Sequence, residues 1–226
     1  MKIGVLLSGC GVYDGAEIQE AVLTLLAIER AGGTPVCIAI NKDQHHVIDH
    51  TNGNEMNESR NMLIESARIA RGEITELNEI EPADIDALVI PGGFGSAKNF
   101  TNWAFKGPDG EILPEVKLLL VNLINIGKPI AALCVSPVVL AKALEGSSYK
   151  PLVTIGSDKS PSPYDIKSFS DGLNSTGLKT EMKSVSEITI DEEFKIITAP
   201  CYMMDARITE IEANINSAIG ALFNLI

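Results

Sequence analysis

Short hydrophobic runs recur along the chain, and longer segments with a helical spacing of apolar residues lie between them. The runs show no polar alternation, which is typical of parallel strands covered by helices on both faces. They are KIGVLL (2–7), PVCIAI (35–40), ALVI (87–90), PIAAL (129–133) and LVTI (152–155). The pattern predicts a parallel sheet built from these five segments.

Three intervening segments are predicted helices. The segment 17–31 places its apolar residues on one face and is followed by Gly32 and Gly33, a common helix end. The segment 57–73 repeats the pattern less regularly. The segment 114–129 starts on a proline, which suits a first helical turn, and reaches a glycine before its last proline.

The end of the chain predicts a β-hairpin and a final helix. The runs 186–190 and 195–198 flank a turn at 191–193, and an apolar helical stripe begins at about Asp205. We therefore expect residues 1–226 to form one α/β domain: a doubly wound, mostly parallel, flavodoxin-like sheet with helices on both faces, plus this hairpin and helix. The segment 156–186 is predicted to be a surface loop or part of a lid.

Composition and charge limit the kinds of binding partner that the protein can have. The formal net charge is -12, which disfavours nucleic acid and anionic membranes, and no apolar run is long enough to span a bilayer. The four cysteines show no metal-binding or disulfide spacing, so we expect free thiols, no metal and a cytoplasmic protein. The N-terminus is a poor signal peptide, and its Asp14 and Glu17 argue against a mitochondrial presequence.

Candidate chemistry follows three of the predicted strands. Because ligands bind at the carboxyl ends of parallel strands, the loops there are the candidate site. Cys134 stands where a strand meets a helix that starts near Pro137, a position that favours a thiolate. The alternative is a buried structural cysteine. Cys10, which follows the first predicted strand, is a weaker candidate for the reactive thiol.

Glycines and carboxylates supply the rest of the predicted site. Gly92 and Gly93 follow the third strand, and the amides of Gly93 and Val135 could form an oxyanion hole. Glu17 and Glu20 are one helical turn apart, and either could exchange a proton with the thiol, although a solvated acidic first turn is the alternative.

The longer motifs resemble a known superfamily. The pair IDALVIPGGFGSAKN and AALCVSP is similar to the ThiJ/PfpI, class I glutamine amidotransferase-like fold. IGVLLSGCGVYDGAEIQEAVLTLLAIERAG, NESRNMLIESARIARGEI and TAPCYM bring the chain closer to the ElbB branch, described as isoprenoid-biosynthesis-associated and glyoxalase-type. The resemblance covers nearly the whole chain.

That resemblance implies a glutathione-independent glyoxalase that needs no cofactor and converts glyoxal to the 2-hydroxy acid glycolate, or another small dicarbonyl to the corresponding 2-hydroxy acid. Cys134 would form a hemithioacetal, and the matching context favours Glu17 narrowly over Glu20 as the proton shuttle. Gly92, Gly93, Val135 and Cys10 would bind the substrate or its oxyanion. The superfamily also implies a homodimer.

Other functions stay open. No histidine follows Cys134, so the Cys-His-Glu triad of glutamine amidotransferases lacks its base, and protease activity lacks its histidine. The main alternative to the enzyme is a thiol-based redox sensor, or a protein that binds a metabolite or partner linked to isoprenoid metabolism.

Overall fold

A computed structural model describes residues 1–226 and contains one large sheet. Its strand order is β3-β2-β1-β4-β5-β9-β8, and every neighbouring pair is parallel except β8 and β9. The strands are β1 Lys2–Leu6, β2 Thr34–Ala39, β3 Thr75–Glu76, β4 Ala87–Ile90, β5 Ile130–Leu133, β8 Thr189–Asp191 and β9 Ile196–Ala199. The predicted α/β, mostly parallel and flavodoxin-like class is confirmed.

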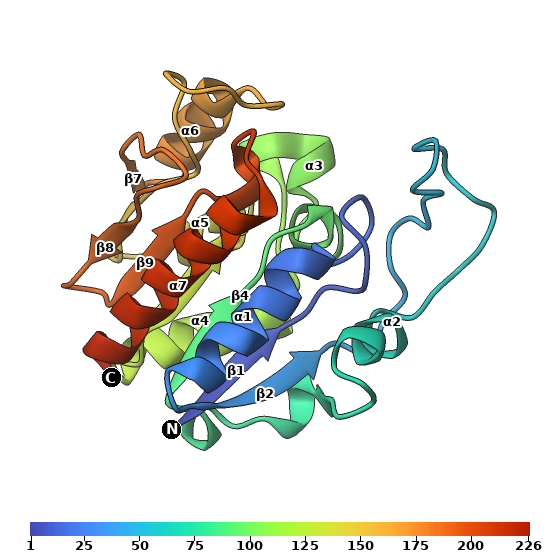
Figure 1. Ribbon diagram of the computed structural model, residues 1–226, viewed down its shortest axis with the longest axis horizontal. Helices are drawn as coiled ribbons and strands as arrows, with labels where there is room; N and C mark the ends of the chain where they lie inside the picture. The colour runs from blue at the N-terminus through green and yellow to red at the C-terminus, as the bar shows by residue number, and fades with distance from the viewer.

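Helices cover both faces of this sheet (Figure 1). Helices α1 (Ile18–Arg30) and α7 (Ile208–Leu225) pack side by side on one face. Helices α4 (Pro114–Asn125) and α5 (Pro137–Leu144) pack together on the other. The apolar strands are thus buried from both sides, which explains why they lack alternation.

The C-terminal hairpin and helix are also confirmed. Strands β8 and β9 pair antiparallel, with Asp191 opposite Ile196. The Asp191 carboxylate accepts a hydrogen bond from the Phe194 amide at 3.0 Å, so an aspartate closes the turn in place of a glycine. Strand β9 also pairs parallel with β5, which brings the residues after β9 next to Cys134.

Three elements differ from the predictions. The helix expected over 57–73 is confined to α2, Met62–Ile69, because the Asn61 side chain caps its start and left-handed residues follow its end. The run 152–155 does not join the main sheet: β6 (Leu152–Val153) pairs with β7 (Lys179–Thr180) in a separate two-stranded sheet. Within 156–186 lies helix α6, Ile166–Ser175.

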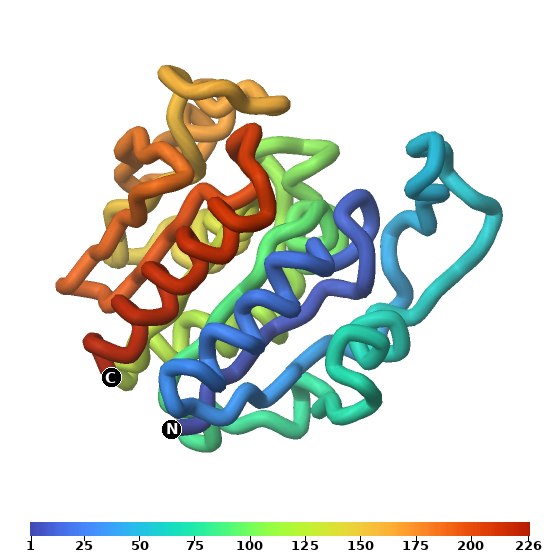
Figure 2. The backbone as a smooth tube through the Cα atoms, viewed as in Figure 1, coloured from blue at the N-terminus to red at the C-terminus, as the bar shows by residue number.

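Two further features complete the architecture. The segment between β2 and α2 extends away from the sheet as a long loop, best followed in the backbone trace (Figure 2). The short helix α3, Trp103–Lys106, lies between β4 and α4 in the chain. None of the helices combines the length and the apolar character needed to cross a bilayer.

Candidate functional site

The turn between β5 and α5 presents Cys134 in a strained conformation. Its φ is 57°, in the left-handed region that residues other than glycine seldom adopt. Pro137 occupies the first turn of α5, as predicted from its missing amide hydrogen. Cys134 is only 6% exposed, so this turn holds the thiol beneath the surface rather than on an open rim.

Glu20 lies directly against this thiol. It projects from the first turn of α1, is completely buried, and its carboxyl group is hydrogen-bonded to the Cys134 side chain. Oε2 accepts from the Gly92 amide at 2.9 Å, and Oε1 accepts from the Tyr202 amide at 3.1 Å. The loops after β4 and β9 therefore fix this carboxyl group from two sides.

Glu17 has a different place in the same site. It is the N-cap of α1, and its Oε2 accepts a hydrogen bond from the Glu20 amide at 2.6 Å. Its own amide donates to the Gly92 carbonyl at 2.9 Å. Glu17 is half-buried and lines the small cavity beside Cys134. The structure thus brings both predicted glutamates to the site, but it is Glu20 that is hydrogen-bonded to the thiol.

Only glycine fits at position 92, because the backbone there passes very close to the side chains of Cys134 and Glu20. A Cβ atom there would lie 2.3 Å from the Cβ of Cys134 and 2.4 Å from Oε2 of Glu20, which no side chain can tolerate. Gly93 has a φ of 96°, again in the left-handed region. The amides of Gly93 and Val135 are both hydrogen-bonded to the Cys134 side chain. The two predicted oxyanion donors therefore converge on the sulfur.

Burial sets the charge state of the pair. Desolvation, with a smaller contribution from the charge of Glu17, raises the pKa of Glu20 to about 8. Desolvation and the nearby Glu20 charge raise the pKa of the Cys134 thiol well above its ordinary value, although the Gly93 and Val135 amides oppose this. The position of Cys134 in the sequence predicts a stabilised thiolate, but in the structure burial affects the thiol pKa more than the neighbouring amides do. At neutral pH both groups are therefore largely uncharged.

Two adjoining cavities lead to the thiol. The inner one has a volume of about 20 Å³, room for roughly one water molecule. The outer one measures about 410 Å³ and is open to solvent. The residues that line both are Val12, Glu17, Tyr164 and Tyr202.

Several residues of the site were not predicted from the sequence. Tyr164 comes from the segment 156–186, and burial and the nearby Cys134 raise its pKa to about 12. Tyr202 and Met203 follow β9 and line the inner cavity. Cys201 is completely buried beside Cys134. The backbone amide of Cys134 is hydrogen-bonded to the side chain of Cys201. The motif TAPCYM at the end of a predicted strand is the signal that could have pointed to Tyr202; for Cys201, which follows Pro200, the sequence does indicate a place on the same rim.

Cys10 and the histidines lie elsewhere. The charges that act on the Cys10 thiol are those of Glu65, Arg68 and Asp14, and Cys10 does not line either cavity. His50 accepts a hydrogen bond from the Tyr13 amide at 3.2 Å and is likewise absent from both cavities. The structure therefore does not bring Cys10 to the thiol of Cys134. No group of three or more His, Cys, Asp or Glu side chains is arranged to hold a metal ion.

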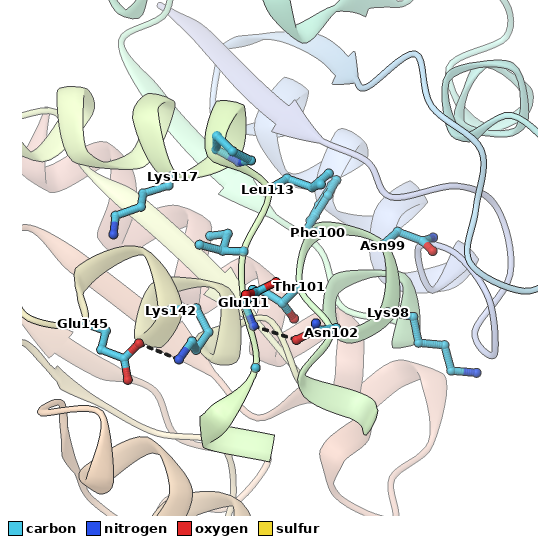
Figure 3. A pocket seen from close by; sticks show the side chains of 13 residues that line it. Lys98, Asn99, Phe100, Thr101, Asn102, Glu111, Leu113, Lys117, Lys142 and Glu145 are labelled. Atoms are coloured by element: carbon cyan, nitrogen blue, oxygen red, sulfur yellow. Dashed lines mark hydrogen bonds and ion pairs between the residues drawn. The ribbon is translucent and has the colours of Figure 1, made fainter. Parts of the chain in front are cut away.

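A larger cleft of about 630 Å³ lies apart from this site (Figure 3). In it the Lys142 ammonium group pairs with Glu145, and the Glu111 amide donates to the Asn102 side chain. None of its lining residues lines the Cys134 cavities. Its one buried lysine, Lys142, is already paired with Glu145, so Cys134 stays the stronger candidate for a reactive group.

Comparison with known proteins agrees with this fold. No protein-family model matches the chain. The human glutamine amidotransferase-like class 1 domain-containing protein 3, mitochondrial, is 38% identical over 226 residues, covering 99% of this chain and 83% of that protein. The chain belongs to this glutamine amidotransferase-like class 1 family. The rat ES1 protein homolog, mitochondrial, is 37% identical and is covered to 84%.

Solved structures extend the family relationship. The glutamine amidotransferase-like class 1 chain superposes with a TM-score of 0.90 on an isoprenoid biosynthesis protein with an amidotransferase-like domain from Ehrlichia chaffeensis. The two are 35% identical, over 100% of this chain and 99% of that one. A ThiJ/PfpI domain protein from Brachyspira murdochii, at 15% identity and a TM-score of 0.56, shares the fold.

Proposed function

We propose that this protein is a cofactor-independent glyoxalase-type enzyme of the ElbB-like branch, a lyase or hydratase that converts glyoxal to glycolate. The observation that carries the proposal is the buried hydrogen-bonded pair of Glu20 and Cys134, with the amides of Gly93 and Val135 directed at the same sulfur. A nucleophile, a proton carrier and two oxyanion donors thereby meet at one point.

The first step is addition of the thiol to an aldehyde. In the fraction of molecules whose Glu20 is ionised, the thiol proton passes to the Glu20 carboxylate as the sulfur–carbon bond forms, and the carbonyl electrons move to oxygen. The Gly93 and Val135 amides contact the sulfur, and the new oxyanion is separated from that sulfur by a single carbon atom, so the same amides stabilise it until Glu20 returns the proton. The product of this step is a hemithioacetal on Cys134.

The second step moves a hydrogen between the two carbons. The Glu20 carboxylate removes the proton from the sulfur-bearing carbon, and the electrons pass into the neighbouring carbonyl to give an enediol. Return of that proton to the neighbouring carbon leaves a thioester, which water hydrolyses to glycolate and the free thiol. The sum is glyoxal plus water to glycolic acid. A carboxyl group with a pKa of about 8 suits both directions of proton transfer near neutral pH.

The missing histidine supports this choice over amide hydrolysis. All three histidines precede Cys134 in the sequence, and none lines the cavities around it. A thiol assisted only by a carboxyl group is adequate for a reactive aldehyde, whereas an amide needs a stronger base and a protonated leaving group.

The second candidate function is a thiol-based redox sensor or a binding protein. With this function we also propose a link to isoprenoid metabolism. The Ehrlichia relative carries isoprenoid biosynthesis in its name. Buried Cys201 beside Cys134 favours a thiol-based response, because two neighbouring thiols can be oxidised together. The raised pKa of Cys134 disfavours it, since a peroxide sensor reacts as the thiolate.

Glycolate formation decides between these functions. The purified protein is incubated with glyoxal, and glycolate is quantified beside Cys134→Ser and, as a control thiol outside the cavities, Cys10→Ser. We expect many turnovers per protein molecule, abolished by Cys134→Ser and kept by Cys10→Ser. Stoichiometric modification of Cys134 with no glycolate would favour the sensor or binding protein.

We also propose that the chain forms a homodimer. Ile18, Val22 and Leu26 are spaced one helical turn apart on α1, and their side chains are 45%, 47% and 38% exposed. Analytical ultracentrifugation of Val22→Lys is expected to give monomers. Leu118→Lys, which introduces the same charge at an exposed apolar position of α4, is the control and should stay dimeric.

A cytoplasmic location is kept as a proposal. All four cysteines are free, as a reducing compartment requires. The human and rat relatives are named mitochondrial proteins, so the family is not restricted to the cytoplasm. Fractionation of the native cells, followed by immunoblotting, would assign the compartment of this chain.

A further inference from the structure

The route to Cys134 carries negative charge only. The inner and outer cavities together have just two lining residues of the Asp, Glu, Lys, Arg and His types, namely Glu17 and Asp205. Neither cavity is lined by a lysine, an arginine or a histidine. The remaining lining residues are uncharged: aromatic, aliphatic and sulfur-containing side chains, one glycine and the amide of Gln19. A bound anion would therefore meet like charge and find no cation.

Two cations that lie close to residues lining the cavities are engaged in other contacts. Lys98 donates to the Tyr13 carbonyl at 2.8 Å and lines the separate large cleft. Arg207, two residues beyond Asp205, contacts Glu210 at 3.3 Å, and its side chain is 84% exposed. Neither lines the path to the thiol, so neither offers an anchor for a carboxylate.

We propose that the site selects its carbonyl substrates by charge, admitting uncharged ones and rejecting those that bear a carboxylate, with Glu17 and Asp205 as the specificity-determining residues. The inner cavity has room for roughly one water molecule, so an entering carboxylate would lose its hydration without gaining an ion pair. Rejection by like charge is an effective source of specificity.

The same arrangement assists product release. The enzymatic form of this inference rests on the proposed glyoxalase function, in which a neutral dialdehyde becomes a carboxylate. The glycolate anion is formed beside Glu17 and leaves past Asp205, so both carboxylates disfavour its retention. We therefore expect glycolate to inhibit the enzyme weakly.

Alkylation of Cys134 tests charge selection without requiring turnover. Neutral iodoacetamide and anionic iodoacetate differ little in size, and labelling of the full-length protein is followed by mass spectrometry of the peptide that contains Cys134. The ratio of the two rates is compared with that of N-acetylcysteine, at a pH where iodoacetamide labels the protein. We expect the preference for iodoacetamide to exceed the reference by about tenfold.

Variants identify the residues responsible. Glu17→Gln and Asp205→Asn should each bring the ratio closer to the reference. Glu29→Gln removes the same charge from an exposed position of α1 outside both cavities and should leave the ratio unchanged. A ratio equal to that of N-acetylcysteine would overturn the proposal. So would failure of iodoacetamide to label Cys134 at every pH at which the protein stays folded, because the cavities would then admit neither reagent.

The two proposals can fail separately. Charge-selective alkylation with no glycolate from glyoxal would remove the glyoxalase function and keep the charge selection. Glycolate formation with no charge preference in alkylation would keep the enzyme and remove the selection.

Discussion

The carboxyl group of Glu20 is hydrogen-bonded to the thiol of Cys134, and both groups are buried. One comes from the first turn of α1 and the other from the turn after β5, so the fold brings together two groups that lie 114 positions apart in the sequence. This pair, rather than an exposed thiolate, lies at the centre of the candidate site. In the proposed mechanism, one proton moves between the substrate and these two groups at each stage.

The first prediction distinguishes the roles of Glu17 and Glu20 in proton transfer. Glu20→Gln keeps the shape and the acceptor for the Tyr202 amide but removes the proton carrier, so we expect kcat/KM for glyoxal to fall by about 10²- to 10⁴-fold. Glu17→Gln keeps an oxygen that can cap α1, and we expect a loss below about tenfold. Steady-state glycolate formation measures both.

Circular dichroism of the two variants is the control for folding. If both fold and Glu17→Gln proves the more damaging, the shuttle is Glu17, and Glu20 holds the thiol in place instead. Equal losses would mean that the two carboxyl groups act as one proton-sharing unit.

The second prediction concerns stability and pH. The pKa of Glu20 is raised from 4.5 to about 8 on folding, so the folded state holds a proton that the unfolded state releases. This contribution is fully present below pH 4.5 and is lost as the pH rises toward 8, at most about 5 kcal/mol at 1.36 kcal/mol for each pKa unit. We expect the free energy of unfolding to fall over this range.

Urea unfolding at pH 5 and pH 8 measures the effect. Glu20→Gln cannot ionise, so its stability should change less between these two pH values than that of the unaltered protein. The smaller rise in the pKa of Glu17 has the same sign and is present in both proteins, so the comparison isolates Glu20. An equal pH dependence in both would contradict a buried neutral Glu20.

The architecture and the strand-to-helix turn that carries Cys134 could be predicted from the sequence, because both follow from local patterns. Unalternating apolar runs define the buried strands, and a cysteine followed by a proline marks a strand-to-helix turn. The choice between Glu17 and Glu20 could not be made this way. It depends on α1 beginning at Ile18, which turns the Glu17 side chain back toward its own helix and directs Glu20 at the sheet.

The parts that were not predicted depend on tertiary packing. Tyr164 reaches the cavity from a segment with no strong periodicity, and Tyr202 does so because β9 pairs with β5. The sign of the pKa shift at Cys134 was missed for a similar reason. A helix start and two amides favour the thiolate locally, but the burial that outweighs them is a property of the assembled fold.

The third prediction uses a glycine that no close contact constrains. Gly220 lies exposed within α7, and a Cβ atom there would have no neighbour within 4 Å. Gly220→Ala should stabilise the protein by about 0.5–1 kcal/mol because alanine loses less backbone entropy in a helix. Urea unfolding measures the change, and a loss of stability would mean that this face of α7 is covered in solution.

The last prediction concerns Gly92, where the same substitution should have the opposite result. A methyl group would lie 2.3 Å from the Cβ of Cys134 and 2.4 Å from Oε2 of Glu20, so one of the two side chains must move. Because proton transfer depends on their hydrogen bond, we expect Gly92→Ala to lower kcat/KM by about 10²-fold or more. Gly220→Ala is the matched control and should retain full activity. A fully active Gly92→Ala would mean that contact between Glu20 and Cys134 is not needed for turnover.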